Sequence, residues 1–226
     1  KMACGDPKAM AKVAILDPEL TLSQPPRVTA CTGIDAIAHA VETAVTRKRN
    51  DTSLKYSRAA FQIMLESFSR VLESPDDLHA RGQMLLGAAY AGTAIEHSML
   101  GAAHSAANPL TAHYNVVHGQ AVGMMLPHVV RFNSDDAATA EAYAEFVEGT
   151  SVSTTNGTPA PESLARSLET ILDIAQLPRD LTAFGVDAAR LDLLSEEAAG
   201  QWTASFNPRD ITAGDFKRLY QKAFAS

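Results

Sequence analysis

The sequence predicts an all-α protein, a helical bundle preceded by one short strand. Across most of the chain, apolar residues recur with a period near 3.6 residues, which is typical of amphipathic helices. Prolines and Ser/Thr/Gly-rich stretches divide this pattern into segments of helical length. Only residues 12–16, before Asp17-Pro18, form a short apolar run that suits a strand. We therefore expect a lead-in with the strand at residues 1–26 and an all-helical domain at residues 27–226.

The expected helices follow one another with short breaks between them. They cover residues 28–47, 52–73, 76–98, 101–107, 118–132, 139–148, 161–175, 187–201 and 212–224. Alanine and glycine are frequent in the first helix, so neighbouring helices can approach it closely. An Asp-Thr-Ser sequence at 51–53 is expected to cap the second helix, and a Ser-Pro-Asp sequence at 74–76 the third.

Hydrophobicity and proline content shape the later part of the chain. The third helix is apolar on nearly all sides, which predicts that it lies at the centre of the bundle. Asn108-Pro109 is expected to end or kink the fourth helix, and Pro127 to bend the fifth. Residues 149–161 are rich in Ser, Thr, Gly and Pro, so we expect a mobile loop there.

The composition is that of a globular protein and argues against several kinds of partner. The 226 residues are 46% hydrophobic and 20% charged, enough to bury one substantial core. A net charge of -7 argues against binding to nucleic acid or to an anionic membrane surface. The only cysteines are Cys4 and Cys31, too few for a secreted disulfide framework, and no apolar run is long enough to cross a bilayer. A cytoplasmic location is therefore expected.

Four side chains are candidate metal ligands: Asp35, His39, His104 and His118. Asp35 and His39 are four residues apart, which places both on one face of a helix. One carboxylate and three imidazoles form a donor set that suits a divalent transition metal such as iron or zinc. Asp35 has small apolar neighbours and should face inward, where a cation would offset its charge. Taken singly, such residues are often ordinary surface or core groups, so the prediction depends on the complete set.

The order and spacing of several segments resemble the C-terminal, metal-binding half of the iron-containing (group III) alcohol dehydrogenases. The segments that carry the resemblance are residues 14–21, 32–42, 91–92, 101–104, 118–119, 126–129 and 207–209. The resemblance implies a helical domain like the C-terminal domain of dehydroquinate synthase, with the four candidate residues as metal ligands. It implies Fe²⁺ as the metal, and the donor set alone would also accept Zn²⁺, Mn²⁺ or Co²⁺.

The resemblance also implies an NAD(P)-linked interconversion of a small alcohol and an aldehyde or ketone. The metal would act as a Lewis acid on the substrate oxygen, and hydride would pass to the nicotinamide ring. The sequence contains no Gly-rich strand–turn–helix dinucleotide motif, so we expect the family's N-terminal nucleotide-binding domain to be absent. The chain alone should hold metal but be inactive, and an apolar cofactor-facing surface should make it a homo-oligomer.

Two further positions are candidate substrate-pocket residues by resemblance. Ile95, nine residues before His104, corresponds to a pocket-lining position. Asn108 stands four residues after the same histidine, where members of the family often carry another histidine. Asparagine can form hydrogen bonds but cannot exchange a proton near neutral pH, so the substrate preference or the proton route should differ. No catalytic residue beyond the metal ligands is expected.

Two other functions stay open on the sequence alone. The first is a non-catalytic, metal-bearing helical fragment that serves as an oligomerisation module. The second is a metal-dependent hydrolase in which Asp35 and the histidines activate water, although the adjacent His-Asp pair usual in helical phosphohydrolases is missing. The remaining histidines are expected to have structural or surface roles: His79, His97, His113 and His128.

Overall fold

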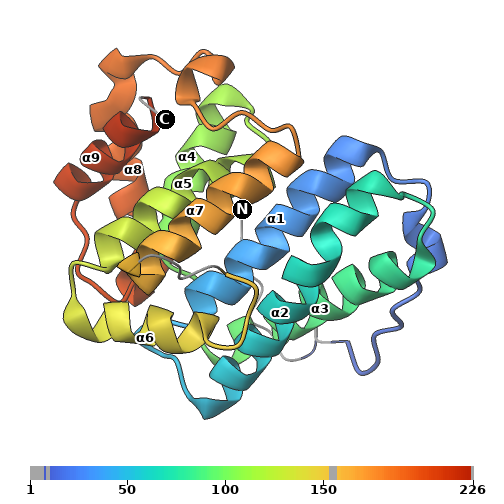
Figure 1. The fold of residues 1–226 in the computed structure, drawn as a ribbon. Helices are drawn as coiled ribbons and strands as arrows, with labels where there is room; N and C mark the ends of the chain where they lie inside the picture. Colours follow the sequence, from blue (N-terminus) through green and yellow to red (C-terminus); the bar gives the residue numbers. More distant parts are fainter. Residues whose placement is uncertain (1–7, 9–10, 153–156, 225–226) are drawn as a thin grey trace.

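A computed structural model describes residues 8, 11–152 and 157–224, and the chain is all-helical within them, as the sequence predicts (Figure 1). The α-helices are α1 (Pro26–Thr43), α2 (Asp51–Glu73), α3 (Leu78–His97), α4 (Ala102–Tyr114), α5 (His118–Asn133), α6 (Ala137–Val147), α7 (Ala160–Ile174), α8 (Leu191–Ala199) and α9 (Ala213–Ala223). Short 3-10 helices include η2 (Pro18–Thr21) and η6 (Trp202–Phe206). No helix in this described part combines the length and the apolar character needed to cross a membrane.

Helix α5 lies at the centre of the bundle. It packs against α1, α4, α7 and α9, and every residue from Gly119 to Val130 is buried. Helices α2 and α3 pair beside α1 on one side of α5, and α8 and α9 lie on the other side (Figure 1). The site therefore forms where helices from both sides of the bundle meet the central helix.

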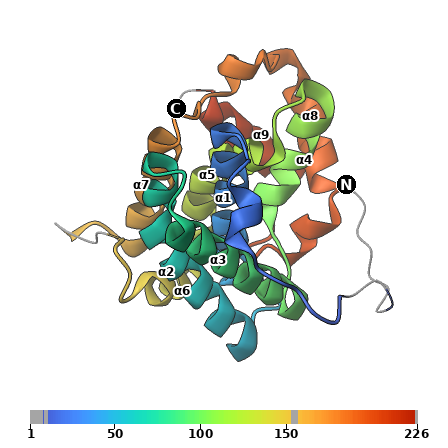
Figure 2. The ribbon, with the colours of Figure 1, turned by 90° about the vertical axis from the view of Figure 1, so that its right-hand side faces the viewer.

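The predicted central position of the third helix is wrong. Helix α3 packs mainly on α2 and α1 and lies at the outer side of the bundle (Figure 2). Its large side chains, including Met84, Leu85 and Leu86, are only half-buried. An apolar surface on all sides indicates that a helix favours burial, but it does not specify which neighbours are available to cover each face.

Two glycines let α5 approach α1 closely. A Cβ added at Gly119 would lie 1.9 Å from the carbonyl oxygen of Cys31, and one at Gly123 would lie 2.6 Å from Cγ2 of Ile34. Both distances are far below van der Waals contact, so only glycine fits at these positions in this packing. The two glycines are one turn apart on the face of α5 that meets α1. This close crossing brings the start of α5 beside the middle of α1.

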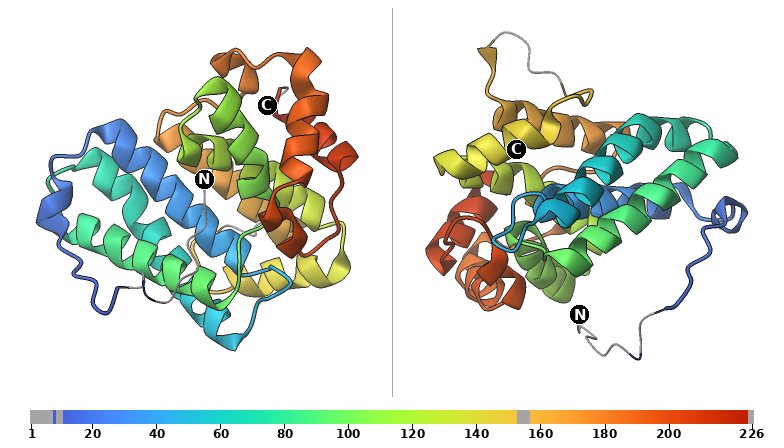
Figure 3. Two further views of the ribbon diagram at one scale, coloured as in Figure 1. Left: turned by 180° about the vertical axis from the view of Figure 1, so that it is seen from behind. Right: turned by 90° about the horizontal axis from the view of Figure 1, so that it is seen from below.

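The predicted strand at residues 12–16 is wrong. This segment is irregular and exposed, and it runs along the outside of the bundle (Figure 3). Val13 and Ile15 are 78% and 87% exposed. A strand is stabilised by hydrogen bonds to a neighbouring strand, and the described part of the chain contains no strand that could pair with it. The apolar run alone was therefore insufficient evidence for a strand.

The predicted end of the fourth helix is also wrong. Helix α4 continues past Asn108-Pro109 as far as Tyr114 and closes at Asn115, which has a left-handed φ of 52°. Pro109 is buried inside the helix. Proline removes one backbone hydrogen bond, but packing of α4 against α5 and α8 outweighs this local preference. Helix α5 likewise contains a proline and continues beyond it.

Helix boundaries elsewhere lie close to the predicted ones. The N-cap of α2 is Asn50, whose side chain accepts from the backbone N–H of Ser53 in a capping box. The N-cap of α3 is Asp77, one residue after the predicted sequence. Helix α7 begins at Ala160, at the end of the predicted loop, and residues 153–156 of that loop lie outside the described residues.

Candidate metal centre

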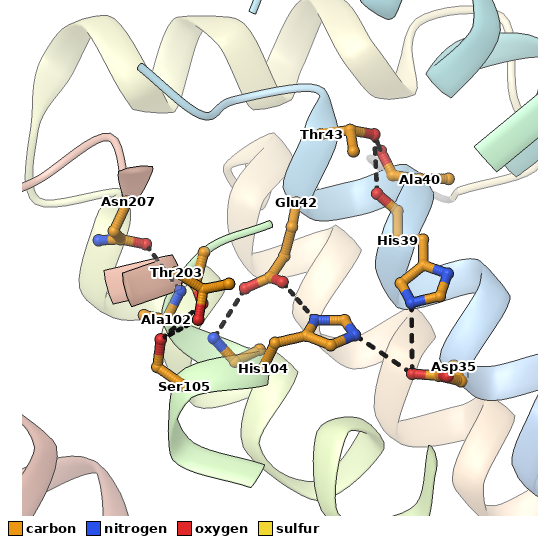
Figure 4. A network of polar contacts seen from close by, with 12 residues as sticks. Asp35, His39, Ala40, Glu42, Thr43, Ala102, His104, Ser105, Thr203 and Asn207 are labelled. Atoms are coloured by element: carbon orange, nitrogen blue, oxygen red, sulfur yellow. Dashed lines mark hydrogen bonds and ion pairs between the residues drawn. The ribbon is translucent and has the colours of Figure 1, made fainter. Parts of the chain in front are cut away.

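Three imidazoles converge on the carboxylate of Asp35. Asp35 and His39 lie one turn apart on α1, His104 lies in the first turn of α4, and His118 begins α5. The Nε2 atoms of His104, His39 and His118 lie 3.2, 3.6 and 3.8 Å from Oδ1 of Asp35. Figure 4 shows the α1 and α4 members of this group pointing toward one another. The structure thus brings together all four residues that the sequence analysis singled out.

The spacing and chemistry of these donors fit a divalent metal ion. Four ligands placed tetrahedrally about 2.1 Å from an ion lie roughly 3.4 Å from one another. Ligand atoms of Asp35, His39 and His104 all lie within 4.8 Å of one another, and His118 completes the group through its contact with Asp35. The donor set therefore fits such an ion, and its assignment as the metal-binding set stays a prediction.

Ring packing and burial distinguish His104 from the other three residues of the site. The rings of His39 and His104 are stacked with centroids 4.8 Å apart, and those of His104 and His118 are tilted with centroids 5.4 Å apart. The side chain of His104 is 3% exposed, whereas those of Asp35, His39 and His118 are 20–22% exposed. Asp35, His39 and His118 are therefore partly accessible to solvent, whereas His104 is not.

Glu42 is a member of the site that the sequence analysis did not single out. Its Oε2 lies 2.6 Å from Nδ1 of His104, and its Oε1 accepts from the backbone N–H of Ala103 at 2.7 Å (Figure 4). Glu42 follows Asp35 by seven residues and His39 by three, so all three side chains lie on one face of α1. This spacing was visible in the sequence, but the partner of Glu42 lies 62 residues further along the chain.

The contacts within the site favour the charged forms of Asp35, Glu42 and His104. Burial opposes ionisation of Asp35, but the hydrogen bond from His104 and the three nearby imidazoles lower its pKa well below the usual range. Burial likewise opposes ionisation of Glu42, and the charge and hydrogen bond of His104 lower its pKa. Burial would lower the pKa of His104, but Glu42 and Asp35 raise it to about 9. A metal that binds Nε2 of His104 must therefore displace a proton.

The two predicted pocket residues lie on α3 and α4. Asn108 is one turn after His104, and its Nδ2 donates to Oε1 of Gln201 at 2.9 Å. Gln201 in turn donates to the backbone oxygen of Glu197, so the Asn108 amide is tied to the end of α8. Ile95 is half-buried in the last turn of α3. A role for either residue in a substrate pocket stays a prediction.

The four remaining histidines lie outside this cluster. His79 and His97 are exposed near the two ends of α3. His113, at the end of α4, pairs with the carboxylate of Glu197 at 2.8 Å. His128 is buried in α5 close to the positive charges of Arg131 and Lys222.

We expect His128 to make the metal-free protein sensitive to acid. Burial and the charge of Arg131 lower its pKa from 6.5 to about 4 in the folded chain, so unfolding takes up a proton between these values. The contribution to stability is fully present above pH 6.5 and is lost as the pH falls toward 4. Chemical denaturation of the metal-free protein at pH 7 and at pH 4.5 measures how much unfolding free energy is lost on acidification. This loss should be about 2 to 3 kcal/mol smaller in the His128→Gln variant than in the unaltered chain. Equal losses in the two proteins would contradict this.

Comparison with known proteins places this geometry in a family. Residues 29–224 match the Fe-containing alcohol dehydrogenase family, C-terminal. Long-chain-alcohol dehydrogenase 1 of Geobacillus thermodenitrificans is 31% identical over 217 residues, which cover 96% of this chain and 55% of that protein. The NADPH-dependent butanol dehydrogenase of Clostridium saccharobutylicum is 30% identical over 213 residues, covering 92% and 54%. The solved structure of an alcohol dehydrogenase from Oenococcus oeni superposes with a TM-score of 0.83 at 26% identity, covering 91% and 54%.

The match includes all four predicted metal ligands and extends from α1 to the end of α9. The chain spans about half the length of the relatives it matches, so the likeness concerns one part of those proteins. Within that part, the sequence alignment and the structural superposition each cover more than nine-tenths of this chain. The chain belongs to the Fe-containing alcohol dehydrogenase family, in which it corresponds to the C-terminal region.

Proposed function

We propose that this chain is the metal-binding part of an alcohol dehydrogenase that interconverts an alcohol and an aldehyde or ketone with NAD or NADP. The observation that carries the proposal is the convergence of three imidazole Nε2 atoms on one oxygen of Asp35. Family membership supplies the reaction class, because the relatives are named as dehydrogenases of long-chain alcohols and of butanol.

The four converging residues would hold one divalent cation. Fe²⁺ is the first choice because of the family, and Zn²⁺, Mn²⁺ and Co²⁺ suit the same donors. When bound, the cation supplies Lewis acidity toward an alcohol or carbonyl oxygen. Asp35 contributes the negative charge of the set, and the three imidazoles fix the position of the cation relative to α1, α4 and α5. The partial exposure of Asp35, His39 and His118 would allow a small alcohol or carbonyl compound to approach.

The reaction also requires a nicotinamide cofactor as the hydride acceptor. This sequence lacks a Gly-rich dinucleotide motif, so we infer that NAD or NADP is held mainly by residues outside it. Val13, Ile15 and Leu20 are exposed, and the large side chains of α3 are half-buried. Such apolar surface favours association, so we infer a homo-oligomer. With only two cysteines in the sequence, we infer a cytoplasmic location.

Metal loading and complementation test the proposal together. The purified chain, stripped with a chelator and dialysed against Fe²⁺ without oxygen or against Zn²⁺, should retain one ion per chain. It should not reduce NAD⁺ or NADP⁺ in the presence of short alcohols. A fusion to the preceding part of the Geobacillus relative should gain that activity, with loss of activity on removal of the metal.

Each other function gives a different result in the same experiment. Failure of the unaltered chain to retain metal would contradict the proposed site. Clear turnover by the chain alone would contradict the inference that the cofactor is held mainly by residues outside this sequence. Metal retention in defined oligomers without activity in the fusion would favour the oligomerisation module. Metal-dependent hydrolysis of phosphoesters without a nicotinamide cofactor would favour the hydrolase.

A further inference from the structure

We propose that Glu42 is a positioning residue that holds the proton of His104 on Nδ1 and ties this ring to the start of α4. The inference rests on the proposed function, because it matters chiefly if Nε2 of His104 binds a metal. It concerns a carboxylate that is buried together with the ring, at 4% and 3% side-chain exposure. Burial makes the orientation of both groups dependent on each other, since water does not compete for their hydrogen bonds.

In the hydrogen bond between Glu42 and His104, the ring is the donor. Oε2 of Glu42 lies 2.6 Å from Nδ1 of His104. An ionised carboxylate only accepts hydrogen bonds, so Nδ1 must be the donor. In the neutral ring the lone pair then lies on Nε2, the nitrogen that faces Oδ1 of Asp35 at 3.2 Å. A histidine that binds metal through Nε2 needs this tautomer, and a carboxylate on the other nitrogen stabilises it.

The other oxygen of the Glu42 carboxylate contacts the N-terminus of α4. The N-cap of helix α4 is Gly101, which offers no side chain to cap the first backbone N–H groups. Oε1 of Glu42 accepts from the N–H of Ala103, and Oδ1 of Asn207 lies 3.4 Å from the N–H of Ala102. A carboxylate at a helix N-terminus is also favoured by the helix dipole. Glu42 therefore caps α4 from α1, and the capped residue directly precedes His104.

Glycine at position 101 leaves room for this arrangement. A Cβ there would lie 3.1 Å from Oε1 of Glu42 and 3.2 Å from Oδ1 of Asn207, tighter than most contacts of this kind. One buried carboxylate thus fixes both the tautomer of His104 and the place where its helix starts. Separation of α4 from α1 would release both at once, so the metal centre depends on the polar contacts that join α1 to α4.

The Glu42→Gln variant separates positioning from simple capping. The backbone N–H groups of Gly101 and Ala103 face the carboxylate, so the amide oxygen should stay on the helix side. The amide NH₂ would then point at Nδ1 of His104 and require a lone pair there. The proton of the ring should move to Nε2, which takes away the metal-binding lone pair while the cap of α4 remains. The control is Asn207→Ala, which removes the neighbouring cap, together with the hydrogen bonds between Asn207 and Asn133, without touching His104.

Two measurements on the unaltered chain and the variants test the proposal. Nitrogen-15 NMR of the imidazole in the metal-free protein, recorded at a pH at which the ring is neutral, should show the proton of His104 on Nδ1 in the unaltered chain and in N207A, but on Nε2 in E42Q. Competition with a zinc chelator should show Zn²⁺ affinity about 10- to 100-fold lower in E42Q and unchanged in N207A. If E42Q does not fold, Glu42→Asp, which is too short for both contacts, should lower Zn²⁺ affinity by several-fold.

The outcomes distinguish this inference from the proposed function. A proton that stays on Nδ1 in E42Q, or an equal loss of Zn²⁺ affinity in N207A, would show that Glu42 only caps α4. Zn²⁺ affinity in E42D equal to that of the unaltered chain would likewise overturn the inference. If the unaltered chain does not bind Zn²⁺, the proposed function fails, and the NMR comparison still decides whether Glu42 sets the tautomer.

Discussion

Replacing Asp35 by asparagine should abolish tight binding of a divalent metal. Oδ1 of Asp35 is the atom on which the Nε2 atoms of His39, His104 and His118 converge, within 3.8 Å or less. Its lowered pKa keeps the carboxylate ionised at neutral pH, so it supplies negative charge to a bound cation. Asparagine retains an oxygen of similar size but loses the charge, and its NH₂ group competes with the metal for imidazole nitrogens. Mutation of a group that hydrogen-bonds to a metal ligand typically lowers metal affinity by about 10- to 100-fold. Loss of a ligand charge should have a larger effect, so D35N should lower the affinity by at least about 100-fold.

The measurement is the Zn²⁺ affinity of D35N by chelator competition, together with the metal content after dialysis. Asp210→Asn is a matched control, because Asp210 is 93% exposed and pairs with Arg47 at the surface. Its removal changes the net charge equally and should leave metal binding unchanged. A D35N protein that is folded and keeps the metal content of the unaltered chain would show that the four residues do not form the binding set.

The fold class and the ligand set could be predicted for different reasons. Helices were visible because each apolar face repeats with the helical period, a property of the local sequence. The ligands were visible because their residue types carry the chemistry and because Asp35 and His39 share one helical face. His104 and His118 could be added only through the family resemblance, since nothing local indicates that α4 and α5 begin beside the middle of α1. The structure supplies that convergence.

The errors share one physical origin, which is the dependence of a segment on its neighbours. Residues 12–16 have the composition of a strand but no described strand to pair with. Pro109 favours a helix end locally, yet the packing of α4 keeps the helix intact. The third helix was placed at the centre from its own hydrophobicity, although burial depends on what covers it. Glu42 was missed because a glutamate near a helix end is usually solvated, and only folding reveals the imidazole beside it.

Replacing Gly119 by alanine should cost both stability and metal affinity. The added Cβ would lie 1.9 Å from the carbonyl oxygen of Cys31, so α5 must move away from α1. Overpacking of this kind typically costs about 1 to 3 kcal/mol. Because His118 directly precedes Gly119, the same movement would draw its Nε2 away from Asp35. Urea denaturation of the metal-free protein and Zn²⁺ competition should therefore both show a loss.

Gly92→Ala is the matched control for this prediction. Gly92 lies within α3, and a Cβ there would meet nothing within 4 Å. Alanine at an open position in a helix is favoured over glycine by roughly 0.5 to 1 kcal/mol, so G92A should be slightly more stable and should bind Zn²⁺ as the unaltered chain does. If G119A matched G92A in both measurements, the close crossing of α1 and α5 would not be what places His118. A loss confined to G119A would mean that the backbone contact at Cys31 holds the metal-binding residues of two helices together.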